Sequence, residues 1–216
     1  HADLFEGNGD FINLGTNATL NINNNFTISA WVNIPTLAGS PAYGVVSWGQ
    51  DTAGKRRSIL IWNGGSGSSH RLYFSGYFAP ANLVGTSDLS DDKWHHLVVT
   101  LSSSNEAKVY VDGRMENAGS VTLAPYSFSG SYIGATPLGD GDQEYFSGSI
   151  DEVAIWSRVL HENEVMQLYR RGANRIKYQV RSCGSANCTD HTNGGNWKGH
   201  DGTKNTYYSE LQNTSS

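Results

Sequence analysis

An acidic pair interrupts an apolar run near the end of the chain, in the stretch GSIDEVAIWSRVL at 148–160. Alternation predicts a strand in which Asp151, Val153 and Ile155 share one face. Apolar residues occupy both faces, so we expect this strand to be covered on both sides. A carboxylate at Asp151 is costly to bury there unless a cation, an arginine or a backbone amide pairs with it.

A second group of acidic residues lies in the glycine-rich loop 137–148, PLGDGDQEYFSG. Asp140, Asp142 and Glu144 supply hard oxygen ligands, and glycine lets the backbone turn its carbonyls inward, which is typical of calcium loops. The loop does not match the twelve-residue pattern of helix–loop–helix calcium sites. A solvated surface loop accounts for the same composition, so both interpretations stay open.

The two cysteines, Cys183 and Cys188, are separated by four residues in a polar segment. This spacing allows a turn that closes a disulfide, which would stabilise the fold by roughly 2 kcal/mol and indicates an oxidising compartment. Free thiols are a second interpretation. A zinc site is a third, with His191 and His200 nearby, although the pattern fits no standard zinc finger.

The sequence offers no pattern typical of a catalytic centre. Glycosidases place two carboxylates on either side of the scissile bond, but the acidic runs at 151–153 and 161–165 fall on the predicted final strand and helix. His95 and His96 are neighbours in a predicted strand, so they point to opposite faces and cannot act together. Catalysis is not expected, and an enzyme of the glucanase or lyase kind is a distant alternative.

The elements that position these residues are mostly short strands. Period-two alternation and apolar runs predict strands at, among others, 26–34, 93–102 and 107–113, the last ending in an Asp-Gly turn. Many short strands separated by Gly, Ser and Asp turns predict an all-β, two-sheet antiparallel jelly-roll sandwich. One helix is predicted at 161–172, because acidic residues at its start and arginines at its end complement the helix dipole.

Composition excludes two classes of partner. The chain has 216 residues and a net charge of −5, with no run of Lys and Arg longer than KRR at 55–57. Nucleic-acid binding would need a basic stripe, and membrane insertion would need about 20 consecutive apolar residues. Neither is present. There is also no initiator methionine and no signal peptide, so we expect the chain to be part of a longer one.

A change in composition after Gly172 predicts two parts. We expect residues 1–172 to form the jelly roll and 173–216 to form an appended β-rich extension, stapled by the disulfide, or the start of a further module. The extension is too short to bury a large core of its own.

The ordered set of FTISAWV, KWHHLVVTL, VYVDG, YIG and FSGSIDEVAIWSRVLHENEVMQLYRRG resembles a laminin G-like domain, one of the concanavalin A-like jelly rolls. The resemblance covers about residues 3–172. It implies two antiparallel sheets, one of them concave, packed face to face with a helix at one edge. Similar modules occur in large bacterial surface proteins and fibre adhesins, which implies an extracellular or cell-surface setting.

The resemblance also implies a structural calcium ion on the convex side. Members of this fold hold it with an Asp at the start of the final strand, the N-terminal segment and backbone carbonyls; the matching residues here are Asp151, Asp10 and Asn8. Pentraxins bind a second, ligand-associated calcium through the loop before the last strand and an acidic residue after an early strand. The loose counterparts in this chain are the loop 137–148 and Asp51.

Exposed aromatic rings stack on the apolar faces of sugars, so some of the aromatic residues are candidates for a ligand platform. The candidates are Trp31, Trp48, Trp62 and Tyr77. Core packing is the alternative for each of them, and Trp94 is interpreted as structural.

The predicted function is a non-catalytic extracellular module that binds a glycan or a partner protein, with calcium as a structural cofactor. The alternative is a structural or oligomerising domain of a fibre or surface protein, whose tail at 173–216 makes homo-oligomeric contacts. Fold alone does not choose between these functions.

Overall fold

The structure is a computed structural model that describes residues 2–16, 24–36, 43–49, 55–62, 69–75, 82–125, 130–136 and 144–173. The chain divides into two compact units, His1–Tyr169 and Arg170–Ser216. The two sheets belong to the first unit. The predicted extension beyond residue 173, with Cys183 and Cys188, lies outside the described residues. The disulfide between these cysteines and the boundary of the extension therefore stay predictions.

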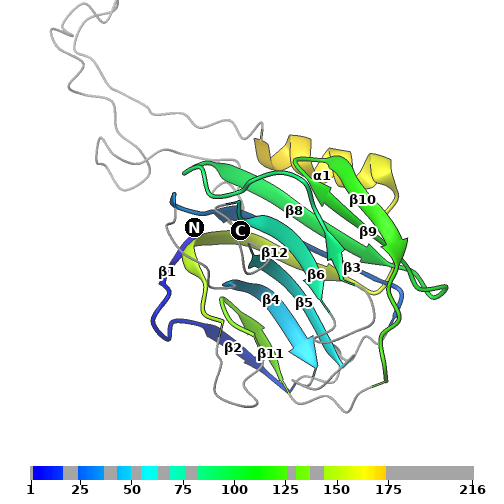
Figure 1. Ribbon diagram of the computed structural model, residues 1–216, viewed down its shortest axis with the longest axis horizontal. Helices are drawn as coiled ribbons and strands as arrows, with labels where there is room; N and C mark the ends of the chain where they lie inside the picture. The colour runs from blue at the N-terminus through cyan, green and yellow to red at the C-terminus, as the bar shows by residue number, and fades with distance from the viewer. Residues whose placement is uncertain are drawn as a thin grey trace, which may run out of the picture. The chain divides into compact units, whose positions relative to one another are not determined.

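Among the described residues, sheet A has six antiparallel strands in the order β1-β12-β3-β8-β9-β10 (Figure 1). Its strands are β1 (Asp3–Glu6), β3 (Phe26–Asn33), β8 (Trp94–Leu101), β9 (Glu106–Val111), β10 (Arg114–Ser120) and β12 (Ser147–Trp156). An Asp-Gly turn joins β9 to β10, with Asp112 and Gly113 both at positive φ. This is the turn that the sequence predicts, because both central positions of such a hairpin need left-handed backbone.

Sheet B, in the same described part of the chain, has six strands in the order β2-β11-β4-β5-β6-β7. Its strands are β2 (Ile12–Gly15), β4 (Tyr43–Gly49), β5 (Arg56–Trp62), β6 (Arg71–Ser75), β7 (Leu83–Val84) and β11 (Ser131–Ile133). The two sheets enclose one apolar core, and we call the side of each sheet that faces away from this core its outer face. The predicted two-sheet antiparallel sandwich is confirmed.

Period-two alternation explains how the core forms. In β3, Phe26, Ile28 and Val32 are completely buried in the main apolar cluster. From sheet B, Trp48 meets Phe26 edge to face, with ring centroids 5.1 Å apart. Such edge-to-face pairs add about 0.5–1.5 kcal/mol to the area that the rings bury.

The helix α1 (Glu162–Ala173) lies over the outer face of sheet A (Figure 1). Its Val165 is buried in a second apolar cluster with Val98 and Tyr110 of the sheet. The first turn is capped by Glu164, which accepts the backbone N–H of His161 at 2.8 Å. The predicted helix is confirmed. No helix of the described segments is long and apolar enough to cross a membrane.

A bulge in β12 corrects the predicted alternation. Ile150, Val153 and Ile155 all pack on the main core, whereas uninterrupted alternation would place Ile150 on the opposite face from the other two. The register of β12 against β3 shifts after Asp151, and Glu152 adopts a φ of 50°. The extra residue at this bulge reverses the alternation, so Asp151 points to the outer face while the isoleucines point inward.

Candidate functional site

Two aromatic rings lie side by side on the outer face of sheet B. Ile61 in β5 and Leu72 in β6 are fully buried in the core, so the residues next to them, Trp62 and Tyr73, point outward. Their ring centroids are 5.0 Å apart with the planes at 56°, and both residues are partly exposed. We call Trp62, Tyr73 and the neighbouring Arg71 the sheet B aromatic site.

Arg71 lies directly opposite Trp62 in the β5–β6 pairing, so both side chains leave the sheet on the same face. It is exposed, and within the described part of the chain no acidic side chain pairs with it. A guanidinium presents up to five N–H donors in a planar fork. The site therefore combines aromatic faces with hydrogen-bond donors.

Trp62 is the predicted platform candidate that the structure places at this site. Trp48 is 1% exposed in the core, where neither face of its ring is open, so the prediction of a platform there is wrong. Tyr77 lies outside the described residues.

The prediction of a platform at Trp31 is also wrong. Trp31 lies on the outer face of sheet A and is only 9% exposed. Tyr169 of α1 stacks on its ring with centroids 5.8 Å apart, and His96 packs against it at 5.1 Å. The helix therefore covers the ring, which explains why a tryptophan occupies a position that alternation assigns to the polar side of β3.

Trp94 is an aromatic residue whose exposure the sequence does not predict. Although interpreted as structural, it is 42% exposed. It lies at the start of β8 opposite Asn33, on the same outer face of sheet A as Trp31. The apolar surface that it presents is on the other sheet from the sheet B aromatic site.

The acidic loop is described only at its end. Glu144 pairs with Arg56 of β5, with Oε2 and Nη1 3.4 Å apart, and its carbonyl accepts the backbone N–H of Gly44 at 3.0 Å. These contacts tie the end of the loop to sheet B. The other candidates for a second calcium site, Asp51, Asp140 and Asp142, lie outside the described residues.

The residues predicted to share one calcium ion are not brought together. Asp10 accepts the backbone N–H of Glu6 at 3.0 Å, and Glu6 lies opposite Ser147 in the β1–β12 pairing. Asp151 lies four residues further along β12, which corresponds to about 13 Å in a strand. Calcium–oxygen bonds are about 2.3–2.6 Å long, so one ion does not fit both carboxylates.

The two halves of that predicted calcium site have local partners instead. Asp151 accepts the N–H of Glu152 at 2.8 Å, which matches the alternative interpretation of a carboxylate that holds a backbone amide. Asn8 lies in the bend between β1 and β2. In the described ranges, no three His, Cys, Asp or Glu side chains are grouped so that they could hold a metal ion.

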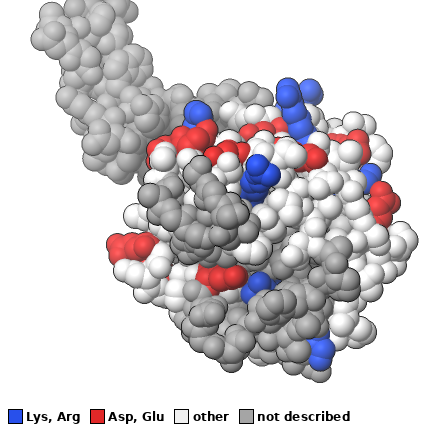
Figure 2. Space-filling model, viewed as in Figure 1, with Lys and Arg blue, Asp and Glu red and all other residues white. Residues whose placement is uncertain are grey.

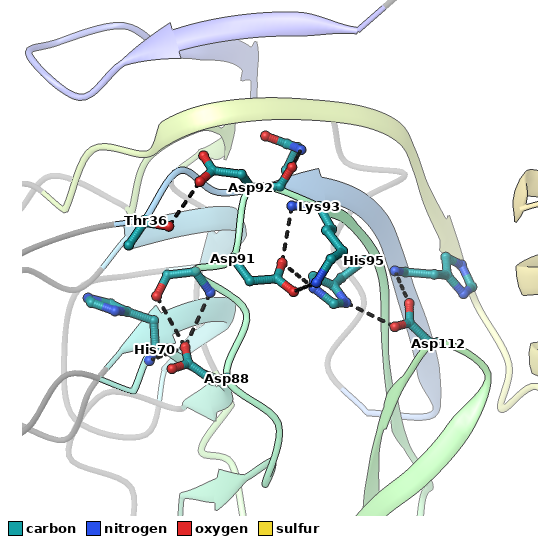
Figure 3. Close-up of polar contacts among 11 residues, drawn as sticks. Thr36, His70, Asp88, Asp91, Asp92, Lys93, His95 and Asp112 are labelled. Atoms are coloured by element: carbon teal, nitrogen blue, oxygen red, sulfur yellow. Dashed lines mark hydrogen bonds and ion pairs between the residues drawn. The ribbon is translucent and has the colours of Figure 1, made fainter.

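A partly buried polar network lies at the start of β8 (Figure 3). The two ring nitrogens of His95 lie 2.9 Å from Asp112 Oδ2 and 3.1 Å from Asp91 Oδ1. Asp112 raises the pKa of His95 most, against burial, which lowers it, and Asp91 raises it further. In Figure 3 the two carboxylates lie on either side of the ring. Both carboxylates therefore favour the imidazolium form of His95.

His96 has the opposite environment. It is 1% exposed and its Nε2 lies 3.1 Å from Ser29 Oγ. Burial lowers its pKa to about 4, against the opposing charge of Asp112. The two histidines point to opposite faces, as alternation predicts, but both contact Asp112, which also accepts the backbone N–H of His96 at 2.9 Å.

Two other acidic residues before β8 fix the loop that carries them. Asp88 accepts the backbone N–H of His70 at 3.0 Å, and Asp92 accepts the hydroxyl of Thr36 at 2.9 Å. Their oxygens hold the loop 88–93 against β6 and the end of β3. The sequence signals for this network are the four-residue spacing of Asp91 and His95 and the Asp-Gly turn at 112–113, which resemble no catalytic motif.

Comparison with known proteins supports the fold. A family model described as the concanavalin A-like lectin/glucanases superfamily matches residues 6–166, and no curated protein matches the chain. Among solved structures, the Ruminococcus gnavus IT-sialidase CBM40 is 15% identical with a TM-score of 0.61, over 78% of this chain and 96% of that one.

Two toxin domains have the same fold. The binding domain of Paraclostridial Mosquitocidal Protein 1 is 16% identical with a TM-score of 0.58, over 82% of this chain and 48% of that one. The Botulinum neurotoxin serotype G binding domain is 15% identical with a TM-score of 0.58, over 82% of this chain and 47% of that one. The chain thus spans about half the length of these two domains.

The family match covers most of the chain, and the matched residues contain most of the strands of the two sheets. The laminin G-like resemblance of the sequence is therefore confirmed, and the chain belongs to the concanavalin A-like lectin/glucanase superfamily.

Proposed function

We propose that this chain is a non-catalytic recognition module that binds a glycan at the sheet B aromatic site. The observation that carries the proposal is the partly exposed pair of Trp62 and Tyr73, 5.0 Å apart on one outer face. Aromatic rings bury a large apolar area with little loss of conformational entropy, and the apolar face of a pyranose ring is a matching surface. Arg71 supplies donors for the hydroxyl or acidic groups at the edge of the sugar.

The comparisons support binding as the general activity. The Ruminococcus gnavus CBM40 domain was also solved with α2,3 sialyllactose bound, and the two toxin structures are named as binding domains. These proteins share the fold at low identity, so the ligand of this chain depends on its own residues.

The setting and the cofactor are separate proposals that rest on the sequence resemblance. We propose an extracellular or cell-surface location. For calcium, we propose Asp151 with backbone carbonyls as the site, because four residues of β12, about 13 Å, separate it from the position opposite Glu6. Asp10 is then a residue that holds the edge of β1.

A glycan array tests the proposed function directly. The whole chain, labelled on lysine, is applied once with calcium and once with a chelator. We expect the labelled chain to bind a group of chemically related glycans reproducibly. An excess of unlabelled chain should reduce this signal, because both forms compete for the same glycans. Absence of glycan binding under both conditions would overturn the proposal.

One observation favours the alternative of an oligomerising domain. The edge strands β1 and β2 carry apolar side chains that are unusually exposed, with Leu4 at 72% and Leu14 at 39%. Exposed apolar edges of this kind are common sites of association. Light scattering on a size-exclusion column gives the mass in solution; a dimer that Leu4→Ser converts to a monomer would support this alternative.

A further inference from the structure

Arg71 differs from the other arginines of sheet B because no acidic side chain among the described residues pairs with its charge. Arg56 pairs with Glu144 at 3.4 Å, and Arg57 donates to the carbonyl of Ala124 at 3.0 Å. Both are buried. Arg71 is exposed, and within the described residues its guanidinium has no acidic partner.

The position of Arg71 places this charge at the edge of the aromatic pair. It lies opposite Trp62 across the β5–β6 ladder, where side chains directly opposite have Cβ atoms about 4.5–5.5 Å apart. Tyr73 is two residues along the same strand and points to the same face. A sugar ring that stacks on either aromatic residue therefore carries its substituents within reach of the guanidinium.

We propose that the ligand of the sheet B aromatic site is a glycan that carries a single anionic group, a carboxylate or a sulfate, bound by Arg71. This inference rests on the proposed function and adds the chemical class of the ligand. Guanidinium groups bind carboxylates and sulfate-like anions through paired, charge-assisted hydrogen bonds. A neutral sugar would leave this charge unused, whereas an acidic sugar would pair with it.

The charge of the whole chain favours a ligand with a single anionic group over a polyanion. The net charge is −5, which repels polyanions at distances up to the Debye length of about 8 Å at physiological salt. Among the residues coloured in Figure 2, basic side chains are scattered over the face in view and do not form a basic patch. A polyanion such as heparin needs a row of cations, so it is not the expected ligand.

The test compares matched glycans on the same core sugars in neutral, carboxylated and sulfated forms, with heparin as the polyanion. The variants are Arg71→Gln and Arg114→Gln; Arg114 is an exposed arginine of β10 in sheet A and controls for the loss of one positive charge. Circular dichroism establishes that each variant is folded.

We expect the acidic glycans to bind more tightly than their neutral counterparts, by about 10- to 100-fold in Kd for a hydrogen-bonded charged group. Arg71→Gln should remove this preference. Arg114→Gln should retain it. The carboxylated and sulfated arms decide which anion is preferred. Equal binding of neutral and acidic forms, or tightest binding of heparin, would overturn the inference while leaving glycan recognition intact. Absence of all glycan binding would overturn the proposed function itself.

Discussion

The Nδ1 atom of His95 lies 2.9 Å from Oδ2 of Asp112, which joins the start of β8 to the turn between β9 and β10. Burial by itself would raise the pKa of Asp112, but the hydrogen bonds from His95 and from the His96 amide lower it. The same contact raises the pKa of His95. The folded state thus favours the charged form of both His95 and Asp112.

This pair predicts a pH-dependent contribution to stability. Because the folded pKa of His95 is raised, its contribution is complete below the unfolded value of about 6.5 and is lost as the pH rises through the folded value. His95→Gln should therefore lower the free energy of unfolding more at pH 6 than at pH 9. Urea unfolding at both pH values measures this, and an equal loss at both would contradict the assignment.

His96 predicts the opposite dependence. Its pKa falls from about 6.5 in the unfolded chain to about 4 in the fold, so the unfolded state binds the proton first. Stability is then lost as the pH falls from 6.5 towards 4, by an amount on the order of 3 kcal/mol. His96→Gln, which can still bond Ser29, should flatten the stability curve in this window. An unchanged slope would contradict a neutral, buried His96.

The fold was largely predictable because its core strands alternate with period two. Phe26, Ile28 and Val32 point inward as the pattern requires, and the Asp-Gly turn sets the β9–β10 hairpin. The same rule assigned Trp31 to the polar side correctly but could not show that α1 covers it, because the helix packs there through contacts far apart in the sequence.

The candidate site was only partly predictable. The sequence predicts Trp62 as a platform residue, but the position of Trp62 opposite Arg71 depends on the register between β5 and β6. A longer loop between two strands leaves that register open in a single sequence. The sequence also does not predict the bulge at Glu152. Glycine is the residue that usually indicates left-handed backbone, and this position holds a glutamate.

The bulge makes a prediction about Glu152, whose φ is 50°. Left-handed backbone costs a residue with a side chain about 1–2 kcal/mol, while glycine adopts it freely but adds entropy to the unfolded chain. Glu152→Gly should therefore be neutral or stabilising by about 0.5 kcal/mol, and the β-branched Glu152→Val should destabilise. Thermal unfolding ranks the two variants, and a Val variant as stable as the Gly variant would argue against the left-handed bulge.

Calcium binding is tested by thermal unfolding with calcium and with excess EGTA. We expect calcium to raise the midpoint, because a ligand of the folded state alone stabilises it. The rise should disappear in Asp151→Ala and persist in Asp10→Ala. If calcium still raises the midpoint in both variants, the ion binds at the loop 137–148. If the rise is lost in both variants, Asp10 and Asp151 share one ion, which would contradict their separation along β12. Absence of any rise would rule out the calcium proposal.

The most direct test of the central claim is calorimetric titration with the tightest-binding glycan of the array, on Trp62→Ala and Trp94→Ala. Both substitutions remove a partly exposed tryptophan, one from the outer face of sheet B and one from that of sheet A. Recognition at the sheet B aromatic site predicts at least a tenfold loss of affinity, about 1.4 kcal/mol, in Trp62→Ala and wild-type affinity in Trp94→Ala. The reverse result would contradict the account and place the ligand on sheet A.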